Sequence, residues 1–497
     1  MRMQATAWSL ALLFLAGCSV GPEYTPPTPK APAEFSARSE IEAAEAVGEA
    51  LLAETTDPAE TRLVETLYEA GEPEADWWRL LGDDDLDRLV EAALQANHDL
   101  RIAEANLVRA RALLGVGRRD RYPTVTSTGS VSRERASLSV TDDDSRDSTV
   151  YSGELAVAWE LDLFGRVRRS IEALEAEEGV AVAELRAVAV AMTADVALTY
   201  LELRGEQDRL AVARENAKNQ RETYELTQAL LEGGRGTDLD LARAEAQLEQ
   251  TLASLAPLEA NIAASMHRLA VLTGRTPGEL VAELTAPSGG SEAARMPALP
   301  STLPIGEPVD LLRRRPDIRA AERRLAAQTA RIGVLVGDLF PRVRLLGGLG
   351  FLSTSASDIA DSGSTTYSIG PFLSWPAFDL GRVRQRIAAA EADGDAALAA
   401  YEQTVLIALE ETENALVDYA RSRERQARLA VAADASQRAA ELANVRYRYG
   451  ADSFLTVLDA ERRLLEAQDL HAQSNTRAAA AFVQLYRALG GAWAVQP

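Results

Sequence analysis

Several residue types are scarce in this 497-residue chain, and each shortage excludes a class of protein. The single cysteine rules out a disulfide within the chain and a thiolate metal cluster. Only three histidines are present, and no two of them have metal-ligand spacing. Positively charged residues are also relatively few: the chain has 52 Lys and Arg and 75 Asp and Glu, which gives a formal net charge of −23. A nucleic-acid partner is therefore not expected, because a phosphate backbone requires a basic surface.

Catalytic signatures are missing as well. The sequence contains no nucleophile motif and no phosphate-binding loop that follows a strand. Carboxylates are abundant, but they lie in long helical segments, where most of them form solvated faces. We therefore expect no enzymatic activity and no cofactor.

The only cysteine ends a segment with the order of a bacterial export signal. Arg2 supplies positive charge, an apolar run follows, and small residues precede Cys18. Leu15-Ala16-Gly17-Cys18 looks like a lipobox, in which cleavage leaves Cys18 as the first residue with lipid attached; a spacer cysteine in an ordinary signal is the alternative. The segment predicts a signal peptide over 1–17 and a covalent lipid on Cys18 that anchors the chain to one leaflet.

Residues 18–75 are predicted to form a lipid-anchored tether. Prolines dominate its first part, which excludes a helix there, and acidic residues dominate its second part. Parts of the acidic segment 38–73 have helical spacing but no wide apolar stripe, so a solvated segment is favoured. No role is assigned to it.

The rest of the chain is an internal duplication. Trp159, Gly165 and Arg166 recur as Trp375, Gly381 and Arg382, all at an offset of 216 residues. A period of this length exceeds that of a solenoid unit, so it indicates two related halves of one body. The predicted divisions are repeat 1 over 76–275, a Pro-rich linker over 276–308, repeat 2 over 309–491 and a C-terminal tail over 492–497.

Each repeat is expected to contribute two strands. From Tyr151 to Leu161, nearly every odd position is apolar and every even one is small or charged. Such strands suit a membrane barrel, with lipid on one side and water on the other, although a half-buried sheet in a soluble domain has the same pattern. Four strands cannot close a barrel, and an open edge in lipid leaves backbone groups unpaired, so several chains would have to share one barrel. The expected strands are about 123–133, 150–161, 342–353 and 365–375.

Very long helices should follow the strands. The stretches 168–232 and 384–448 lack proline and are rich in Ala, Glu, Arg, Leu and Gln. At 1.5 Å per residue, each would be about 100 Å long as one helix. Such a helix needs antiparallel neighbours, as in a coiled coil, and the returning segments 237–272 and 453–489 are expected to supply them. Pro257 should bend the first returning helix.

Local signals place the shorter helices. Asp84 or Asp85 is expected to cap a helix that ends at Ala96, and Asp99 the helix after it. Pro316 fits the first turn of a helix in the second repeat. The basic run 313–315 before it favours a salt-bridged corner over a binding patch.

Taken together, these motifs resemble those of outer-membrane efflux factors, in the lipoprotein or NodT branch of the TolC family. The resemblance covers about residues 74–492 and implies an α+β membrane protein: a homotrimer with a twelve-strand transmembrane β-barrel, four strands per chain, continued by a long periplasmic α-helical barrel. The motifs that carry it, besides the lipobox, are Trp77-Trp78, Asp85-Leu86, Trp159 to Arg166, Arg314-Arg315-Pro316-Asp317-Ile318 and Leu485 to Gly491.

The resemblance also implies a function and partners. A member of this family is a passive exit duct that receives small molecules from an inner-membrane transporter of the RND type through a periplasmic adaptor. Ser19 after the lipidated cysteine favours sorting to the outer membrane of a Gram-negative bacterium. Two alternatives remain open, namely an exit duct for type I protein secretion and a periplasmic coiled-coil lipoprotein that conducts nothing.

Two sets of residues would carry the family's functions. The resemblance places two acids in the closed periplasmic entrance. Asp459 lies at the position of an acidic ring, and Asp240 matches an acid that pairs with an arginine in some relatives. The position of that arginine is Asp452 here, so this particular pair cannot form. Asp459 could equally cap or pair along its own helix. The helix-hairpin tips implied to dock the adaptor comprise Gly234, Thr237, Leu239, Gly450, Ser453 and Leu455.

Overall fold

The computed structural model describes residues 19–28, 32, 34–36, 67–69, 71–137, 139, 147–285 and 296–491. The predicted signal peptide, Cys18, most of the acidic segment and the C-terminal tail lie outside the described residues. Two compact units make up the chain: unit 1 contains Met1–Thr28, Ala105–Val182 and Ala320–Gln403, and unit 2 contains Pro29–Glu104, Ala183–Arg319 and Thr404–Pro497.

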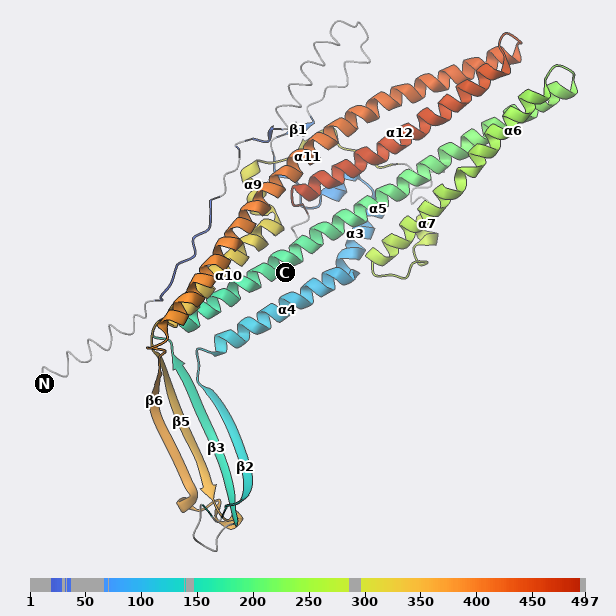
Figure 1. Cartoon of the computed structure of the whole chain (residues 1–497). Coiled ribbons are helices and arrows are strands. Elements are labelled where there is room, and N and C mark those ends of the chain that lie inside the picture. Colours follow the sequence, from blue (N-terminus) through green and yellow to red (C-terminus); the bar gives the residue numbers. More distant parts are fainter. Residues whose placement is uncertain are drawn as a thin grey trace. The chain divides into compact units, whose positions relative to one another are not determined.

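Unit 1 contains an antiparallel sheet in the order β2-β3-β5-β6 (Figure 1). Its strands differ from the expected ranges by three residues at most. Strands β2 and β6 form the two edges, so each has one side without a partner strand in the chain. The strands are β2 (Thr124–Arg135), β3 (Asp147–Leu161), β5 (Arg342–Ser353) and β6 (Thr365–Ser374).

The register of the sheet separates two chemically different faces. Leu155 pairs with Leu349, which pairs with Tyr367, so these three apolar side chains share one face. The next row, Ala156, Gly348 and Ser368, lies on the opposite face. The alternation expected from the sequence therefore agrees across neighbouring strands. Three larger apolar residues depart from it and lie on the face of small and polar residues: Leu346, Leu352 and Phe372.

A tight turn joins β3 to the first long helix, α5 (Arg166–Glu232). The Asp162 carboxylate accepts hydrogen bonds from the backbone N–H groups of Val167 and Arg168, both at 3.0 Å. This cap explains why α5 begins two residues earlier than expected. Gly165 has a φ of +81°, and a Cβ there would lie 2.7 Å from Ser19 Cα. Glycine is therefore required both by the backbone conformation and by the close approach of the N-terminal segment.

The segment that follows Cys18 contacts the helices and the β3–α5 turn of unit 1. The Val20 N–H donates to Phe164 O at 3.2 Å, and the Arg169 side chain donates to Val20 O at 3.2 Å. The Tyr24 hydroxyl donates to Glu322 at 3.1 Å, and the Arg323 guanidinium lies over the Tyr24 ring. Residues 19–28 thus have a defined place on the helices that adjoin the sheet.

Two long hairpins run through the helical part of the chain (Figure 1). The first is α5 with α6 (Asp238–Ala253) and α7 (Leu255–Leu272); the second is α11 (Leu380–Arg448) with α12 (Phe454–Ala488). The break between α6 and α7 at Ser254 lies three residues before Pro257, which has no N–H to bond the Ala253 carbonyl. The first returning helix is therefore interrupted within one turn of the proline expected to bend it.

The remaining elements are short. Pro316 begins α10, as expected. Within the described residues, no helix is both long and apolar enough to cross a membrane. The short elements are β1 (Tyr68–Glu69), η2 (Trp77–Leu81), α3 (Asp84–Ala96), α4 (His98–Arg119), α8 (Val281–Thr285), β4 (Leu303–Pro304), α9 (Pro308–Arg314), α10 (Pro316–Gly337), η3 (Ala356–Asp358) and η4 (Ser362–Ser364).

The two helix caps expected in repeat 1 are wrong by one or two residues. Asp83, rather than Asp84 or Asp85, caps α3, because its carboxylate accepts from the N–H groups of Asp85 and Leu86. Asn97, rather than Asp99, caps α4 in the same way. Tertiary contacts decide both positions, since Asp83 also accepts from the Tyr200 hydroxyl at 2.7 Å and the Asn97 amide donates to Leu272 O at 2.8 Å.

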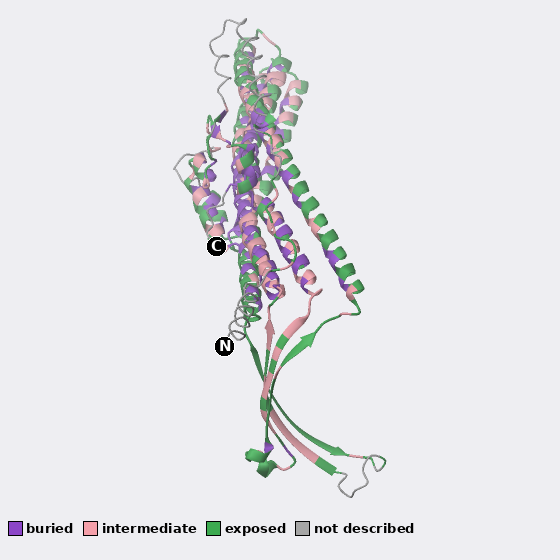
Figure 2. Ribbon diagram, turned by 90° about the vertical axis from the view of Figure 1, so that its left-hand side faces the viewer, coloured by how far each residue is buried: buried purple, intermediate pink, exposed green. Residues whose placement is uncertain are grey.

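The core of unit 2 is aromatic where η2 meets α12. The Trp77 ring stacks on Tyr486 at 5.6 Å and meets the edge of Phe482 at 5.9 Å. Buried residues are concentrated along the helices in Figure 2, whereas the strands of the four-stranded sheet are exposed or half-buried except at Ser353. The helical part of the single chain thus has its own core, and the sheet presents both faces to the surroundings.

Candidate functional site: the helix-hairpin tips

The two hairpins turn by the same mechanism. After α5, Gly234 has a φ of 73°, and the Arg235 N–H donates to Leu230 O at 2.8 Å. After α11, Gly450 has a φ of 71°, and the Ala451 N–H donates to Arg446 O at 2.9 Å. Both bonds belong to a helix end closed by a left-handed residue, a conformation that glycine adopts without steric cost. Both tips lie at the same end of unit 2 (Figure 1).

The residues after the two glycines begin the returning helices. Thr237 caps α6, because its hydroxyl oxygen accepts from the Asp240 N–H at 3.2 Å. Ser453 occupies the equivalent position before α12 but makes no cap bond, and its hydroxyl lies 3.3 Å from that of Thr456. Leu239 and Leu455, at matching positions, are 58% and 55% exposed. Each tip therefore presents a large apolar side chain to solvent, and the second tip also exposes Tyr449, at 86%.

The three acids of the predicted entrance are each paired within their own hairpin. Asp240 accepts from the Thr237 hydroxyl at 2.7 Å, and Asp452 forms an ion pair with Arg446 at 2.5 Å. Asp459 accepts from Arg463 at 2.8 Å and Arg462 at 3.2 Å, both on its own helix.

The hydrogen bond from Arg463, followed by the charges of both guanidiniums, holds the pKa of Asp459 below its ordinary value. Asp459 is therefore an anion flanked by two cations of α12 in the single chain. This is the pairing along one helix that the sequence left open.

One tip residue escaped the sequence analysis. Tyr447, three residues before Gly450, lies next to Thr227 of α5. Burial raises the pKa of Tyr447, and the nearby charge of Asp240 raises it further. Tyr447 thus connects the second hairpin to the first beside a predicted entrance acid. The first repeat has Leu231 at the matching position, so the duplication contained no signal for it.

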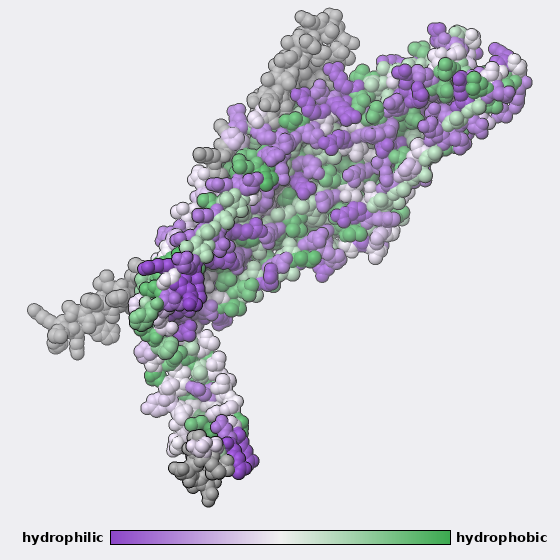
Figure 3. All heavy atoms as spheres, in the orientation of Figure 1, coloured by the Kyte–Doolittle hydropathy of each residue, from purple (hydrophilic) through white to green (hydrophobic). Residues whose placement is uncertain are grey.

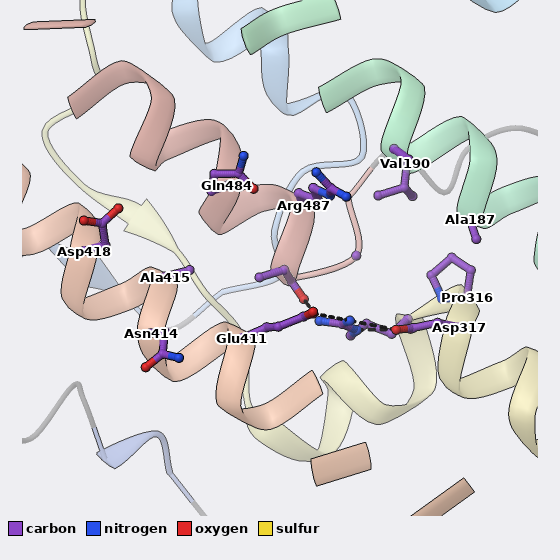
Figure 4. Close-up of a pocket in the computed structure, with 14 residues that line it drawn as sticks. Ala187, Val190, Pro316, Asp317, Glu411, Asn414, Ala415, Asp418, Gln484 and Arg487 are labelled. Atoms are coloured by element: carbon purple, nitrogen blue, oxygen red, sulfur yellow. Dashed lines mark hydrogen bonds and ion pairs between the residues drawn. The ribbon is translucent and has the colours of Figure 1, made fainter. Parts of the chain in front are cut away.

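A second polar cluster lies at the start of α10, beside a cavity of about 720 Å³ (Figure 4). The buried Arg315 guanidinium donates to Glu411 at 2.6 Å, to Asp317 at 2.7 Å and to the Ala488 carbonyl at 3.0 Å. Arg314 pairs with Glu72 at 2.8 Å. The basic run is therefore a salt-bridged corner that joins α10, α11 and the end of α12, as expected.

The part of the chain that the structure describes contains no metal site built from His, Cys, Asp and Glu side chains. No group of three or more His, Cys, Asp or Glu side chains there could hold a metal ion.

Comparisons with known proteins agree with this architecture. The family described as outer membrane efflux protein matches residues 89–275 and 308–491. The chain is 34% identical over 492 residues to the solvent efflux pump outer membrane protein SrpC of Pseudomonas putida, which covers 98% of this chain and 97% of SrpC. It is 32% identical over 483 residues to nodulation protein T of Rhizobium leguminosarum bv. trifolii, covering 96% and 94%.

A solved structure gives the same result. The outer-membrane channel OprN superposes with a TM-score of 0.83 and 42% sequence identity, covering 96% of this chain and 100% of that chain. The resemblance inferred from the motifs is confirmed. The chain belongs to the outer membrane efflux protein family.

Proposed function

We propose that this chain is the outer-membrane channel of an efflux pump, a passive exit duct for small molecules. Its family membership along both repeats carries this proposal. A periplasmic adaptor and an inner-membrane transporter of the RND type would deliver the cargo. A wide duct selects little, so the transporter would choose among drugs, metals and metabolites. SrpC is named as the outer membrane protein of an efflux pump and OprN as an outer-membrane channel, and we propose no enzymatic activity or cofactor for this chain.

The sheet supports a shared barrel. Strands β2 and β6 are edges, and an edge in lipid leaves N–H and C=O groups unpaired at several kcal/mol each, roughly. The β6 edge of one copy can pair with the β2 edge of the next copy, which removes every edge when the ring closes. The apolar row through Leu155, Leu349 and Tyr367 would face lipid, and the row through Ala156, Gly348 and Ser368 would face water.

Exposed apolar side chains on the helices support the same assembly. Figure 3 shows hydrophobic side chains at the surface among hydrophilic ones. In a single chain these side chains are in contact with water, whereas a neighbouring copy would bury them. Three copies, as the family implies, would give a twelve-strand barrel and a helical tube. On α4 and α11 the exposed apolar residues include Ile102, Val108, Val116, Leu406, Val431, Leu442 and Val445.

The place of Ser19 supports lipidation of Cys18. Ser19 lies against Gly165, in the turn where strand β3 ends and helix α5 begins. A strand that crosses the bilayer ends at the membrane surface, so a lipid on the residue before Ser19 would start beside that surface. The chain needs no long tether for this anchor.

The hairpin tips are proposed as the periplasmic entrance and the docking site for the adaptor. The exposed Leu239 and Leu455 offer apolar contacts at equivalent places of the two hairpins. Tyr447, which lies next to Thr227 of the first hairpin and near Asp240, would hold the hairpins together in a closed entrance. Asp459 would contribute to ion preference together with Arg462 and Arg463, which compensate its charge.

Two measurements on the purified protein test the channel. Migration of a trimer that shifts on heating, together with steady conductance in a planar bilayer, is expected. A folded monomer in detergent without conductance would contradict the proposal and favour a structural lipoprotein.

For the entrance, Asp459→Asn should change the cation preference of the reconstituted channel. An unchanged conductance and cation preference would refute the role of Asp459. Arg463→Gln is the matched variant, and it should shift the preference in the opposite direction.

A cellular assay separates small-molecule efflux from protein secretion. A strain without this gene should accumulate a fluorescent pump substrate, and expression of the chain should restore its export. Loss of a secreted protein from the medium, with unchanged export of small molecules, would instead support the secretion duct.

A further inference from the structure

Unit 2 contains a polar cavity of about 970 Å³ among α5, α11 and α12, away from the hairpin glycines. More than half of the residues that line it carry an amide, a hydroxyl or a carboxylate group. The residues that matter here are Asn216, Gln220 and Thr223 of α5, Asn444 of α11, and Glu461 and Gln468 of α12.

Glu461 is the buried charge of this cavity. It is 7% exposed, and its Oε1 accepts from the Thr223 hydroxyl at 2.8 Å and from the Asn444 amide at 3.2 Å. Both partners are neutral. The arginines next to it in sequence, Arg462 and Arg463, pair with Asp459 instead. Burial raises the pKa of Glu461, and the two hydrogen bonds only partly oppose that rise. The carboxylate therefore lacks a compensating positive charge.

Gln220 is a second, independent anomaly. It is 3% exposed, and neither its amide oxygen nor its amide nitrogen has a hydrogen-bond partner in the described chain. Most buried polar groups in proteins are paired, because an unpaired one keeps the full cost of losing its water. Asn216 beside it already donates to Gln468 Oε1 at 2.7 Å and to Val212 O. The Gln220 oxygen thus remains available to a ligand in the cavity.

The charges around the cavity favour a cation. Exposed Glu215, Glu222 and Glu441 line it, against a single lining arginine, Arg448. Lys218 lies 3.6 Å from Glu215 and compensates one of these acids. The remaining negative charge, together with Glu461, makes the potential in the cavity attractive to positive ions.

We propose that this cavity binds an alkali-metal cation, with the Glu461 carboxylate and the Gln220 amide oxygen as its ligands. Hard cations prefer oxygen donors, and amide and hydroxyl oxygens complete such sites together with retained waters. One carboxylate balances one positive charge, whereas calcium sites commonly use several carboxylates. The imidazole and thiolate ligands that transition metals prefer are not among the residues that line the cavity.

Binding would link two long hairpins. Gln220 lies on α5 of the first hairpin and Glu461 lies on α12 of the second, so one ion would join them. Because the ion binds only when these helices are packed together, it stabilises the folded protein by an amount that rises with the logarithm of the ion concentration above its dissociation constant.

The test measures thermal unfolding of the full-length protein in detergent at constant ionic strength. Sodium, potassium and N-methyl-D-glucamine chlorides are compared, since the last cation is too large and lacks the charge density of an alkali ion. The midpoint for the natural sequence should be higher in sodium or potassium by about a few degrees. Broadening of the sodium-23 resonance on addition of the protein gives an independent measure of binding.

Three variants decide the outcome. Glu461→Gln and Gln220→Leu should both lose the alkali-specific shift and the line broadening, whereas Glu466→Gln, an exposed carboxylate of the same helix, should keep them. An equal shift in Glu461→Gln would overturn the proposal, because binding would then occur elsewhere. So would a Gln220→Leu protein that unfolds at a higher temperature in every salt and still responds to sodium, since the amide would then be only an unsatisfied group. A natural protein with no alkali-specific response would also overturn it.

Discussion

Replacing Asp85 by alanine should destabilise unit 2 far more than replacing its neighbour Asp84. Asp85 is 4% exposed, and its carboxylate accepts from Arg204 at 2.8 Å; Arg204 is equally buried. Arg88 forms a second ion pair with Asp85. Without the carboxylate, Arg204 keeps hydrogen bonds to the Tyr200 hydroxyl and Gln207 but becomes an uncompensated buried charge.

The expected loss follows from that charge. Removal of one partner of a buried ion pair costs about 3–5 kcal/mol of unfolding free energy. Asp84 is exposed and contributes mainly through the helix dipole of the first turn of α3, so Asp84→Ala should cost less than about 1 kcal/mol. The two variants differ by one position in a run of three aspartates, which makes them closely matched.

Urea unfolding followed by tryptophan fluorescence is a suitable assay. Trp77 and Trp78 are buried in η2, directly before α3, so their emission reports on this region. Equal losses for Asp84→Ala and Asp85→Ala would refute the reasoning. A further variant combines Asp85→Leu with Arg204→Met. It should regain most of the stability, because an apolar pair of similar size replaces a buried ion pair at little or no cost.

Three further predictions concern the turn, the tips and the cavity. Gly165→Ala should cost at least about 1–2 kcal/mol of unfolding free energy, because the residue has a positive φ and lies against Ser19. Gly381→Ala should be neutral or stabilising, because Gly381 has open space around it and no positive φ. Similar losses of stability in the two variants would contradict this account. Thr237→Ala should cost about 1 kcal/mol of unfolding free energy and speed hydrogen exchange in the first turn of α6. Ser453→Ala removes no cap bond and should leave hydrogen exchange in α12 unchanged. A larger effect of Ser453→Ala than of Thr237→Ala would be evidence against this assignment of the caps. In sodium- and potassium-free buffer, the free energy of unfolding should fall as pH rises above about 4.5, the ordinary pKa of glutamate. Burial raises the pKa of Glu461 in the folded state, so the Glu461 carboxyl loses its proton at a lower pH in the unfolded chain than in the folded one. Denaturant titrations between pH 4.5 and 7.5 measure this slope, which Glu461→Gln should reduce; an unchanged slope would show that other groups set it.

Alternation and helical period were sufficient to place most elements. The strand β5 has the expected bounds, Arg342–Ser353, because Val343, Leu345, Leu349 and Phe351 lie on one face at alternate positions, interrupted by Gly347. The long helices differ from the expected ranges by four residues at most, since their starts depend on side chains such as Asp162 that bond the first turn. Such signals are local, and a sequence shows them directly.

Equivalent positions of the duplication turned out to differ. Gly165 and Gly381 occupy the same place in the repeated motif, yet only Gly165 has a positive φ and a close neighbour. That neighbour, Ser19, comes from the N-terminal segment, which has a single copy. A repeat in sequence therefore predicts similar elements, but the contacts around them depend on parts of the chain outside the repeat.

The acids show the same limit. In the run 83–85, composition suggested a helix cap without indicating which carboxylate would form it. Two residues more than a hundred positions away decide this: Tyr200 bonds Asp83, which is the cap, and Arg204 forms an ion pair with Asp85. Glu461 looked like any other solvated acid of a long helix until Thr223 and Asn444 were found beside it.

By itself, then, the sequence determined the family, the strands, the long helices and the glycine turns, because spacing along the chain sets backbone conformation and the identity of each exposed face. The tertiary structure alone decided the strand register, the contact of Ser19 with Gly165, the pairing of Asp459 with its own helix and the polar cavity at Glu461. These depend on which distant segments lie side by side, and burial there changes the energy of a charge or an amide far more than its sequence neighbours do.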